Sequence, residues 1–583
     1  MLHTLTRSLR ENKGPALVTV LLSALEVVFE IVIPLFMSNL IDFGIEGGSM
    51  AAVWKFGAFL LLLAAFQLST GVLAARIAAR ASVGFAANLR EDMYNNVQTF
   101  AFSNIDKFST ASIVTRLTTD TTNVQNAFQM LMRMAIRAPV MLIFSMIVSF
   151  RISRDISMTF LIILPILALA LFFIIRSVFP VFTRVFRTYD ELNNVVQENV
   201  RGIRVVKSFN QERHEIGKFG AISARIYKDF SKGERLITLN APLMQFCIYT
   251  CMIVISWLGA KAIIASGNDP ALGLTTGNLT ALITYTMQIL SSLMMLSMVF
   301  AMLTISLSSA RRIAEVLEER SDIPQPEQPV MTVRDGAVDF DHVSFVYASK
   351  ADKKVLDDID LHIRSGETIG IIGGTGASKS SLVQLIPRLY DVTGGKLTLG
   401  GVDVRDYDLD TLRGAVAMVL QKNELFSGTI KENLRWGNEN ATDEELQHAC
   451  VLACADEFIS AMPDGYDTHI EQGGTNVSGG QKQRLCIARA LLKKPKVLIL
   501  DDSTSAVDTR TDAQIQQALS TYIPDTTKII IAQRISSVQN ADRIVVLDDG
   551  HIDAVGSHDE LLRTCEIYRE VYESQQKGGE DDA

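Results

Sequence analysis

Cysteine and histidine are scarce in this sequence, which has six cysteines and eight histidines among 583 residues. No two cysteines form a CxxC pair and no histidine cluster accompanies them, so the sequence offers neither a disulfide framework nor a Cys/His zinc site. Cys450 and Cys454 are four residues apart and could together hold a metal, although two thiols at helical spacing are more typical of buried packing. We expect reduced, structural cysteines.

A basic stripe is also missing. The net charge is −9, and the charged residues are spread over the whole chain. A nucleic acid is therefore not expected as a partner. The first residues are basic, but the apolar run that follows them is too long and too poorly flanked for a cleaved signal peptide.

Long apolar runs are absent after about residue 305, whereas six such runs precede it. Each is long enough, at roughly 20 residues, to cross a bilayer as a helix. The predicted spans are residues 16–40, 56–75, 126–150, 156–175, 242–264 and 279–303. The sequence therefore predicts an all-α membrane domain with six helices, and Arg133 and Arg137 fall inside its third span.

The positive charges around these spans predict their orientation. Six crossings leave both termini on one side, and Arg7, Arg10 and Lys13 favour the cytoplasmic side. The connections 41–52 and 265–278 contain no lysine or arginine, as expected of external loops, although Arg151 and Arg154 break this rule. We predict a multi-pass protein of the cell membrane with both termini in the cytoplasm.

The connections 76–125 and 176–240 are polar, charged and poor in proline and glycine. They are expected to continue the spans as helices, and an extension of roughly 25 residues would reach about 40 Å from the membrane. Residues 115–124 and 211–219 lie near the expected turning points and are candidates for the contact with a second domain.

Two groups of residues could line a substrate path through the membrane domain. Glu26 and Glu30 lie on one face of the first span, where carboxylates are costly and often functional. The alternative is an internal ion pair with Arg133 or Arg137. The last span carries several methionines, among them Met294 and Met298, which suit an adaptable surface for a small amphipathic substrate, although core or lipid packing is the more common use.

The second half of the chain contains a phosphate-binding motif. A connector with three prolines, residues 318–329, precedes it, and the strand-like TIGII at 368–372 leads directly into GGTGASKSS at 373–381. This motif resembles the P-loop, which uses backbone N–H groups, a lysine and a hydroxyl to bind ATP and Mg²⁺. The expected ATP-binding residues here are Gly373, Gly374, Thr375, Gly376, Ala377, Ser378, Lys379, Ser380 and Ser381.

The signature VSGGQKQR at 477–484 completes a resemblance that covers essentially the whole chain. The sequence resembles the ATP-binding cassette (ABC) transporter family, specifically an exporter half-transporter. This resemblance implies a type IV exporter-like membrane domain (residues 1–320), a linker (321–335), an α/β P-loop nucleotide-binding domain (336–575) and a polar tail (576–583).

The resemblance also implies roles for individual residues. Tyr347 would stack on adenine, while Ser380, Gln421 and Asp501 would bind Mg²⁺. The signature would contact the γ-phosphate of an ATP held by the opposite subunit, and the loop 505–508 would cross the dimer interface. The signature residues concerned are Ser478, Gly479, Gly480 and Gln481.

Besides Val477, where the signature usually begins with leucine, three residues depart from the family pattern. Asp502 stands where a catalytic glutamate is usual, Gln533 where a histidine is usual, and Ser378 where the P-loop has glycine. Phosphoryl transfer depends on positioning and electrostatics, so these changes predict a degenerate site that binds ATP but hydrolyses it slowly.

The signature is complete and would serve a partner's P-loop. We therefore expect a bacterial heterodimeric multidrug exporter, paired with a second, homologous half-transporter. The alternatives are a homodimeric exporter of lipid or peptide with Asp502 as the base, and an ATP-gated channel or regulatory subunit.

Overall fold

The computed structural model describes residues 1–269, 273–347 and 354–580, and it divides into two compact units. The first comprises Met1–Gln98 and Thr110–Glu319. The second comprises Arg320–Ala583 and also Thr99–Ser109, an insertion from the helical half of the sequence.

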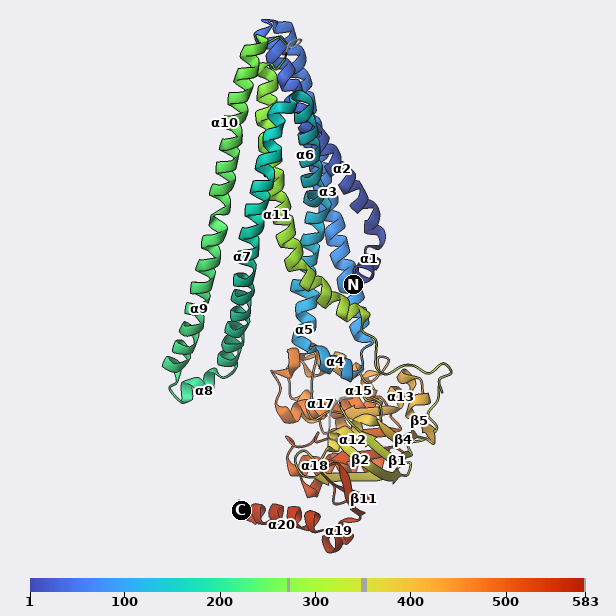
Figure 1. The fold of residues 1–583 in the computed structure, drawn as a ribbon. Coiled ribbons are helices and arrows are strands. Elements are labelled where there is room, and N and C mark those ends of the chain that lie inside the picture. Colours follow the sequence, from blue (N-terminus) through green and yellow to red (C-terminus); the bar gives the residue numbers. More distant parts are fainter. Residues whose placement is uncertain (270–272, 348–353, 581–583) are drawn as a thin grey trace. The chain divides into compact units, whose positions relative to one another are not determined.

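The first unit is built from helices that run side by side (Figure 1). Its helices are α1 (Leu2–Arg7), α2 (Lys13–Asn39), α3 (Met50–Gln98), α5 (Thr110–Thr115), α6 (Thr121–Ile152), α7 (Arg154–Arg201), α8 (Ile203–Ser208), α9 (Glu212–Thr238), α10 (Asn240–Ser266) and α11 (Thr276–Glu318). Within the described residues, six helical stretches are long and apolar enough to cross a membrane. They contain five of the predicted spans in full and the sixth, 279–303, as far as Phe300, and α11 continues beyond that residue. The prediction of six membrane-spanning helices is thus confirmed.

The predicted helical extensions are present. α3 has 49 residues and α7 has 48, so each is about 70 Å long and far exceeds a bilayer. α7 and α9 lie side by side, and α8 lies in the turn between them (Figure 1). Apolar packing among α7, α10 and α11 forms one core of this unit, with Phe160, Ile255 and Ile289 fully buried.

The first turn lies shortly before the segment that the sequence places near it. Residues 115–124 lie at the end of α5 and the start of α6, and the turn itself is at Thr99–Ser109. This segment contains the short helix α4 (Phe102–Phe108) and packs with the second unit. Asn104 donates a hydrogen bond to the carbonyl of Arg320, and Tyr390 donates one to Asp106 (2.9 Å). The second segment, 211–219, lies next to the turn that follows α8, at the start of α9.

The second unit contains a six-stranded sheet of order β12-β11-β3-β10-β9-β6, in which all neighbours except β11 and β12 are parallel. Its strands are β3 (Thr368–Gly373), β6 (Val416–Val419), β9 (Val497–Asp501), β10 (Thr527–Ile531), β11 (Arg543–Asp548) and β12 (His551–Gly556). A second sheet contains β2 (Leu356–Ile363), β1 (Val338–Phe345), β4 (Gly394–Leu399) and β5 (Val402–Asp403), all antiparallel. A third, two-stranded sheet pairs β7 (Gly428–Thr429) antiparallel with β8 (His469–Ile470).

Helices cover these sheets. They are α12 (Lys379–Leu385), α13 (Leu409–Ala415), α14 (Ile430–Arg435), α15 (Asp443–Leu452), α16 (Asp456–Ser460), α17 (Gly479–Leu492), α18 (Thr509–Tyr522), α19 (His558–Thr564) and α20 (Glu566–Glu580). α20 continues through residues that the sequence assigns to the polar tail. All six cysteines are unpaired, and Cys450 is buried.

The strand register decides where a site can form. In the parallel sheet, Ile531 of β10 pairs with both Ile371 of β3 and Asp501 of β9. The carboxyl ends of these three strands therefore meet at one edge, which is where α/β proteins of this kind bind ligands.

Candidate functional site: a phosphate-binding loop and a braced aspartate

The P-loop connects β3 to α12, as the sequence predicts. A Cβ added at Gly374 or Gly376 would meet no atom within 4 Å, so the loop leaves open space on one side. Ser378 has φ +68° and ψ +21°, which is the left-handed conformation that glycine adopts without strain. The serine at this position is therefore accommodated at a cost in backbone strain.

Lys379 folds over its own loop. Its Nζ donates hydrogen bonds to the carbonyls of Gly373 (2.7 Å) and Gly374 (2.9 Å). Burial lowers the pKa of the Lys379 ammonium, although the carboxylates of Asp501 and Asp502 act in the opposite direction. The lysine thus stands between the loop and the two acids.

Tyr347 flanks the start of α12. Its hydroxyl shares a hydrogen bond with Ser381 Oγ (2.7 Å), and its ring meets those of Phe345 and Tyr390 edge-on, with centroids 4.8 and 5.1 Å away. The side chain is nevertheless 43% exposed. An aromatic ring that is held by its neighbours and partly exposed is suited to stacking on a flat base.

Asp501 and Asp502 lie at the carboxyl end of β9 and are both buried. Burial raises the pKa of Asp501, and the nearby charge of Asp502 adds to this, against a hydrogen bond from Ser380 and the charge of Lys379, which lower it. Asp501 and Ser380 are therefore neighbours, and a carboxylate beside a hydroxyl is a donor set that suits Mg²⁺.

Asp502 is held from two sides. Gln421 Nε2 and Gln533 Nε2 both donate to the same oxygen, Asp502 Oδ2, at 3.3 and 2.8 Å. The backbone is fixed too, because Asp502 N donates to Ile531 O (2.9 Å) and the residue has φ +49°. The three sequence-predicted residues thus form one connected group, although nothing in the sequence indicates that both amides share one oxygen.

The signature lies at the start of α17 and is held by its own capping contacts. Ser478 Oγ accepts from Gln481 N, and Gln481 Oε1 accepts from Ser478 N (2.9 Å). A Cβ at Gly480 would lie 2.8 Å from the carbonyl of Ala506, so this position needs glycine. Gln483 holds the same loop by accepting from Ala506 N. The signature and the loop 505–508 therefore form one surface.

The membrane carboxylates of the first span form the ion pair that the sequence left as an alternative. Arg137 on α6 donates to Glu26 Oε1 (2.7 Å) and to Glu30 Oε2 (2.6 Å). Glu30 and Arg137 also line a cavity of about 180 Å³ together with Ala138, Met141, Met287, Gln288, Ser291, Ser292 and Met295. Met294 and Met298 are not among its lining residues; their side chains are 46% and 62% exposed.

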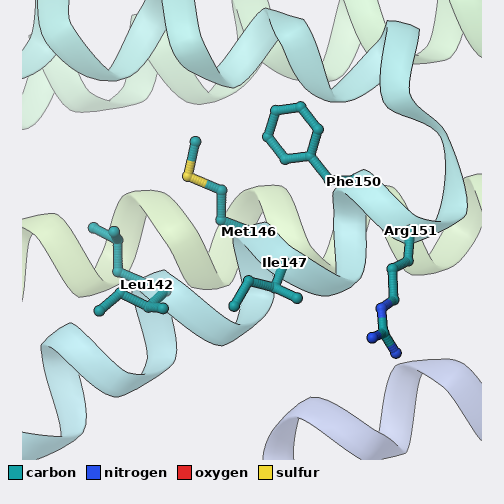
Figure 2. A pocket seen from close by; sticks show the side chains of 6 residues that line it. Leu142, Met146, Ile147, Phe150 and Arg151 are labelled. Atoms are coloured by element: carbon teal, nitrogen blue, oxygen red, sulfur yellow. The ribbon is translucent and has the colours of Figure 1, made fainter.

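A second, larger hollow of about 490 Å³ lies along α6. Its lining is Leu142, Ile143, Met146, Ile147, Phe150 and Arg151. Figure 2 shows the apolar side chains spread along the helix, with Arg151 at the end of the row. Apart from this arginine the lining is apolar, as expected of a membrane-spanning surface.

Both units of this chain are similar to known protein families. Residues 16–294 match the model of the ABC transporter transmembrane region, and residues 356–505 match that of the ABC transporter. The chain is 35% identical over 558 residues to the uncharacterized ABC transporter ATP-binding protein YfiB of Bacillus subtilis, covering 96% of both chains. It is 33% identical over 580 residues to the uncharacterized protein Rv1273c of Mycobacterium tuberculosis, covering 99% of this chain and 98% of that one.

A solved structure shows the same fold. The structure of a bacterial Atm1-family ABC exporter with ATP bound matches with a TM-score of 0.80 at 24% identity, over 97% of this chain and 98% of that one. The chain therefore belongs to the ABC transporter family, as an exporter-type half-transporter that joins one six-helix membrane domain to one nucleotide-binding domain.

Proposed function

We propose that this chain is one subunit of a heterodimeric bacterial exporter, and that its own nucleotide site holds ATP rather than hydrolysing it rapidly. The observation that carries the proposal is the geometry of Asp502, whose Oδ2 accepts from both Gln421 and Gln533. A carboxylate in this position has to orient an attacking water, and two amides already occupy one of its oxygens.

The short side chain adds to this restraint. Aspartate is one methylene, about 1.5 Å, shorter than the glutamate that the family resemblance leads one to expect. A misplacement of about 1 Å can reduce a rate roughly 10²-fold. Gln533 can donate a hydrogen bond to a phosphate but cannot carry positive charge. Aspartate at position 502 and glutamine at position 533 both slow ATP hydrolysis, and both leave ATP binding intact.

The other residues of the site are suited to hold ATP with Mg²⁺. The open side of the loop at Gly374 and Gly376 fits a phosphate, and Lys379 can turn from its loop carbonyls to the β- and γ-phosphates. Mg²⁺ would neutralise phosphate charge, with Ser380 and Asp501 as its protein ligands and Gln421 beside them. Tyr347 would stack on the adenine.

The capped signature has a different task. Ser478 and the glycines after it are held rigidly at the start of a helix, an arrangement that suits anion binding. In the proposed heterodimer they close over ATP in the partner's P-loop, and the partner carries the missing glutamate and histidine. Hydrolysis then takes place mainly at that composite site.

The proposed cargo is a small amphipathic molecule of the multidrug type, moved outward across the bacterial cell membrane. The cavity beside Glu30 and Arg137 combines charged groups with methionine thioethers, which can adapt to varied shapes. The basic N-terminal residues support a topology with both termini in the cytoplasm.

The decisive experiment measures ATP turnover in lipid nanodiscs. The chain alone should be slow, and co-assembly with the product of an adjacent gene carrying the complementary motifs should restore fast turnover. Ser478→Arg in this chain should abolish that fast activity, since it removes the signature from the partner's site. Survival of the activity would contradict the composite-site assignment.

Each alternative predicts a different result. Rapid turnover by the chain alone would favour a homodimer in which Asp502 is the base. A working transporter should also drive substrate into inverted vesicles against a gradient when ATP is added. Flux that only follows the gradient would instead indicate an ATP-gated channel.

A further inference from the structure

The C-terminal helix α20 reaches the loop that carries Gln533. Its first turns are anchored, because Tyr568 is fully buried and its hydroxyl is hydrogen-bonded to His558 Nδ1 (2.7 Å). Val571 and Tyr572 pack against the same core. Gln575 follows Tyr568 by seven residues, or about two turns, and so lies on the same face.

Gln575 binds the backbone of this loop at two points. Its Nε2 donates to the carbonyl of Gln533 (2.8 Å), and its Oε1 accepts from the N–H of Ile535 (2.9 Å). One amide side chain thus bridges Arg534 and fixes the backbone on both sides of it. Both contacts join residues at least 40 positions apart in the sequence.

The braced part of the loop is short. Ala532 and Ile535 are buried at its two ends, with exposed fractions of 4% and 2%. Gln533 and Arg534 between them are exposed. The backbone of Gln533 is therefore held by the buried residues around it and by Gln575, whereas its side chain extends to Asp502 Oδ2 (2.8 Å).

We infer that Gln575 is a positioning residue, through which α20 keeps Gln533 on Asp502 and so sets how long this site retains ATP. The inference rests on the proposed function, in which this site is the slow one. Gln575 touches neither Asp502 nor any P-loop residue in the contacts of the described residues. Its effect must therefore pass through the backbone of Gln533.

The test compares two substitutions on the same helix. Gln575→Met keeps the length and helix propensity of the side chain but removes the donor and the acceptor. Gln576→Met makes the same change at the neighbouring exposed position and serves as the matched control. Both are made in the full chain, assembled in nanodiscs with a partner whose P-loop lysine is replaced by alanine, so that only this site binds ATP.

Two measurements follow. Hydrogen–deuterium exchange of residues 532–537 should become more than fivefold faster in Gln575→Met, because this variant loses two hydrogen bonds and each is worth about 1 kcal/mol, or roughly a factor of five. Release of radiolabelled ATP should accelerate by a similar factor. Gln576→Met should change neither. Gln575→Glu, which keeps an acceptor for Ile535 N–H and loses the donor, should lie between the wild type and Gln575→Met in both.

The outcomes separate the inference from the proposed function. Unchanged exchange in Gln575→Met would overturn the brace itself, whatever the hydrolysis rate. Faster exchange with unchanged ATP release would overturn its link to retention. Rapid ATP turnover by the wild-type chain alone would refute the proposed function, while the exchange result would still report on the brace.

Discussion

Replacing Asp502 by glutamate and Gln533 by histidine should convert the holding site into a hydrolysing one. The longer side chain moves the carboxylate by about 1.5 Å toward a bound nucleotide. It also takes Oδ2 out of the position where Gln421 and Gln533 donate to it at 3.3 and 2.8 Å. Losing one such hydrogen bond costs about 1 kcal/mol, which the fold can accommodate.

The expected gain is larger than this cost. Correcting a misplacement of about 1 Å is worth roughly 10²-fold in rate, or about 2.7 kcal/mol of activation free energy. Histidine at position 533 adds a side chain that can carry charge beside the γ-phosphate. We therefore expect turnover at this site to rise about 10²-fold in the double variant, and less in Asp502→Glu alone.

Phosphate release from nanodiscs measures this rate, with a partner whose own catalytic carboxylate has been removed. Asp525→Glu is the matched control, since it adds the same methylene in an exposed turn before β10, at the end of that strand away from the site. No rise in the single or the double variant would refute the reasoning, because geometry at Asp502 would then not limit hydrolysis.

Three further predictions concern other parts of the chain. Tyr347→Ala should weaken ATP binding about tenfold through lost stacking, whereas Tyr347→Phe should bind almost normally; equilibrium dialysis distinguishes them. Arg137→Met should destabilise the chain by about 3–5 kcal/mol by leaving Glu26 and Glu30 without their partner, and thermal melts should show recovery when both become glutamine. Burial raises the pKa of Asp501, so acidification should protonate this carboxylate and release Mg²⁺ at a higher pH than for an ordinary aspartate. Titrations with Mg²⁺ at several pH values should show this loss of affinity in the wild type and not in Asp501→Asn.

The spans and the P-loop strand were predictable because their signals are local. An apolar run of 20 residues or a β-strand followed by a glycine-rich loop depends little on distant contacts. The left-handed conformation of Ser378 could also be expected, since the motif has glycine there. These features need no knowledge of which segments meet in space.

The turn at Thr99–Ser109 could not be placed from local signals. The segment contains neither glycine nor proline, so nothing in it marks the end of a helix. What ends α3 and shapes the turn is tertiary contact: Asn104 accepts from the N–H groups of Ala101 and Asp322 and donates to the carbonyl of Arg320. Two of these partners, Arg320 and Asp322, lie more than 200 residues away in the sequence.

Local signals were also insufficient to predict the contacts within the nucleotide site. Motifs identified Gln421, Asp502 and Gln533, but the sharing of one carboxylate oxygen depends on how three loops converge. The pairing of Glu26 and Glu30 with Arg137 rather than Arg133 depends on the rotation of α6. Gln575 belongs to no motif, and its role follows only from the two hydrogen bonds that it makes.

The assignment of α4 to the nucleotide-binding unit matters for anyone who wants to exchange domains between such proteins. Cutting at the proline-rich connector would leave eleven residues of one folding unit on the wrong side of the junction. In such a hybrid, the residue at position 390 would come from one protein and its hydrogen-bond partner at position 106 from the other, so the bond from Tyr390 to Asp106 could be lost. Functional hybrids should therefore carry the 99–109 segment with the graft, as a second, distant insertion.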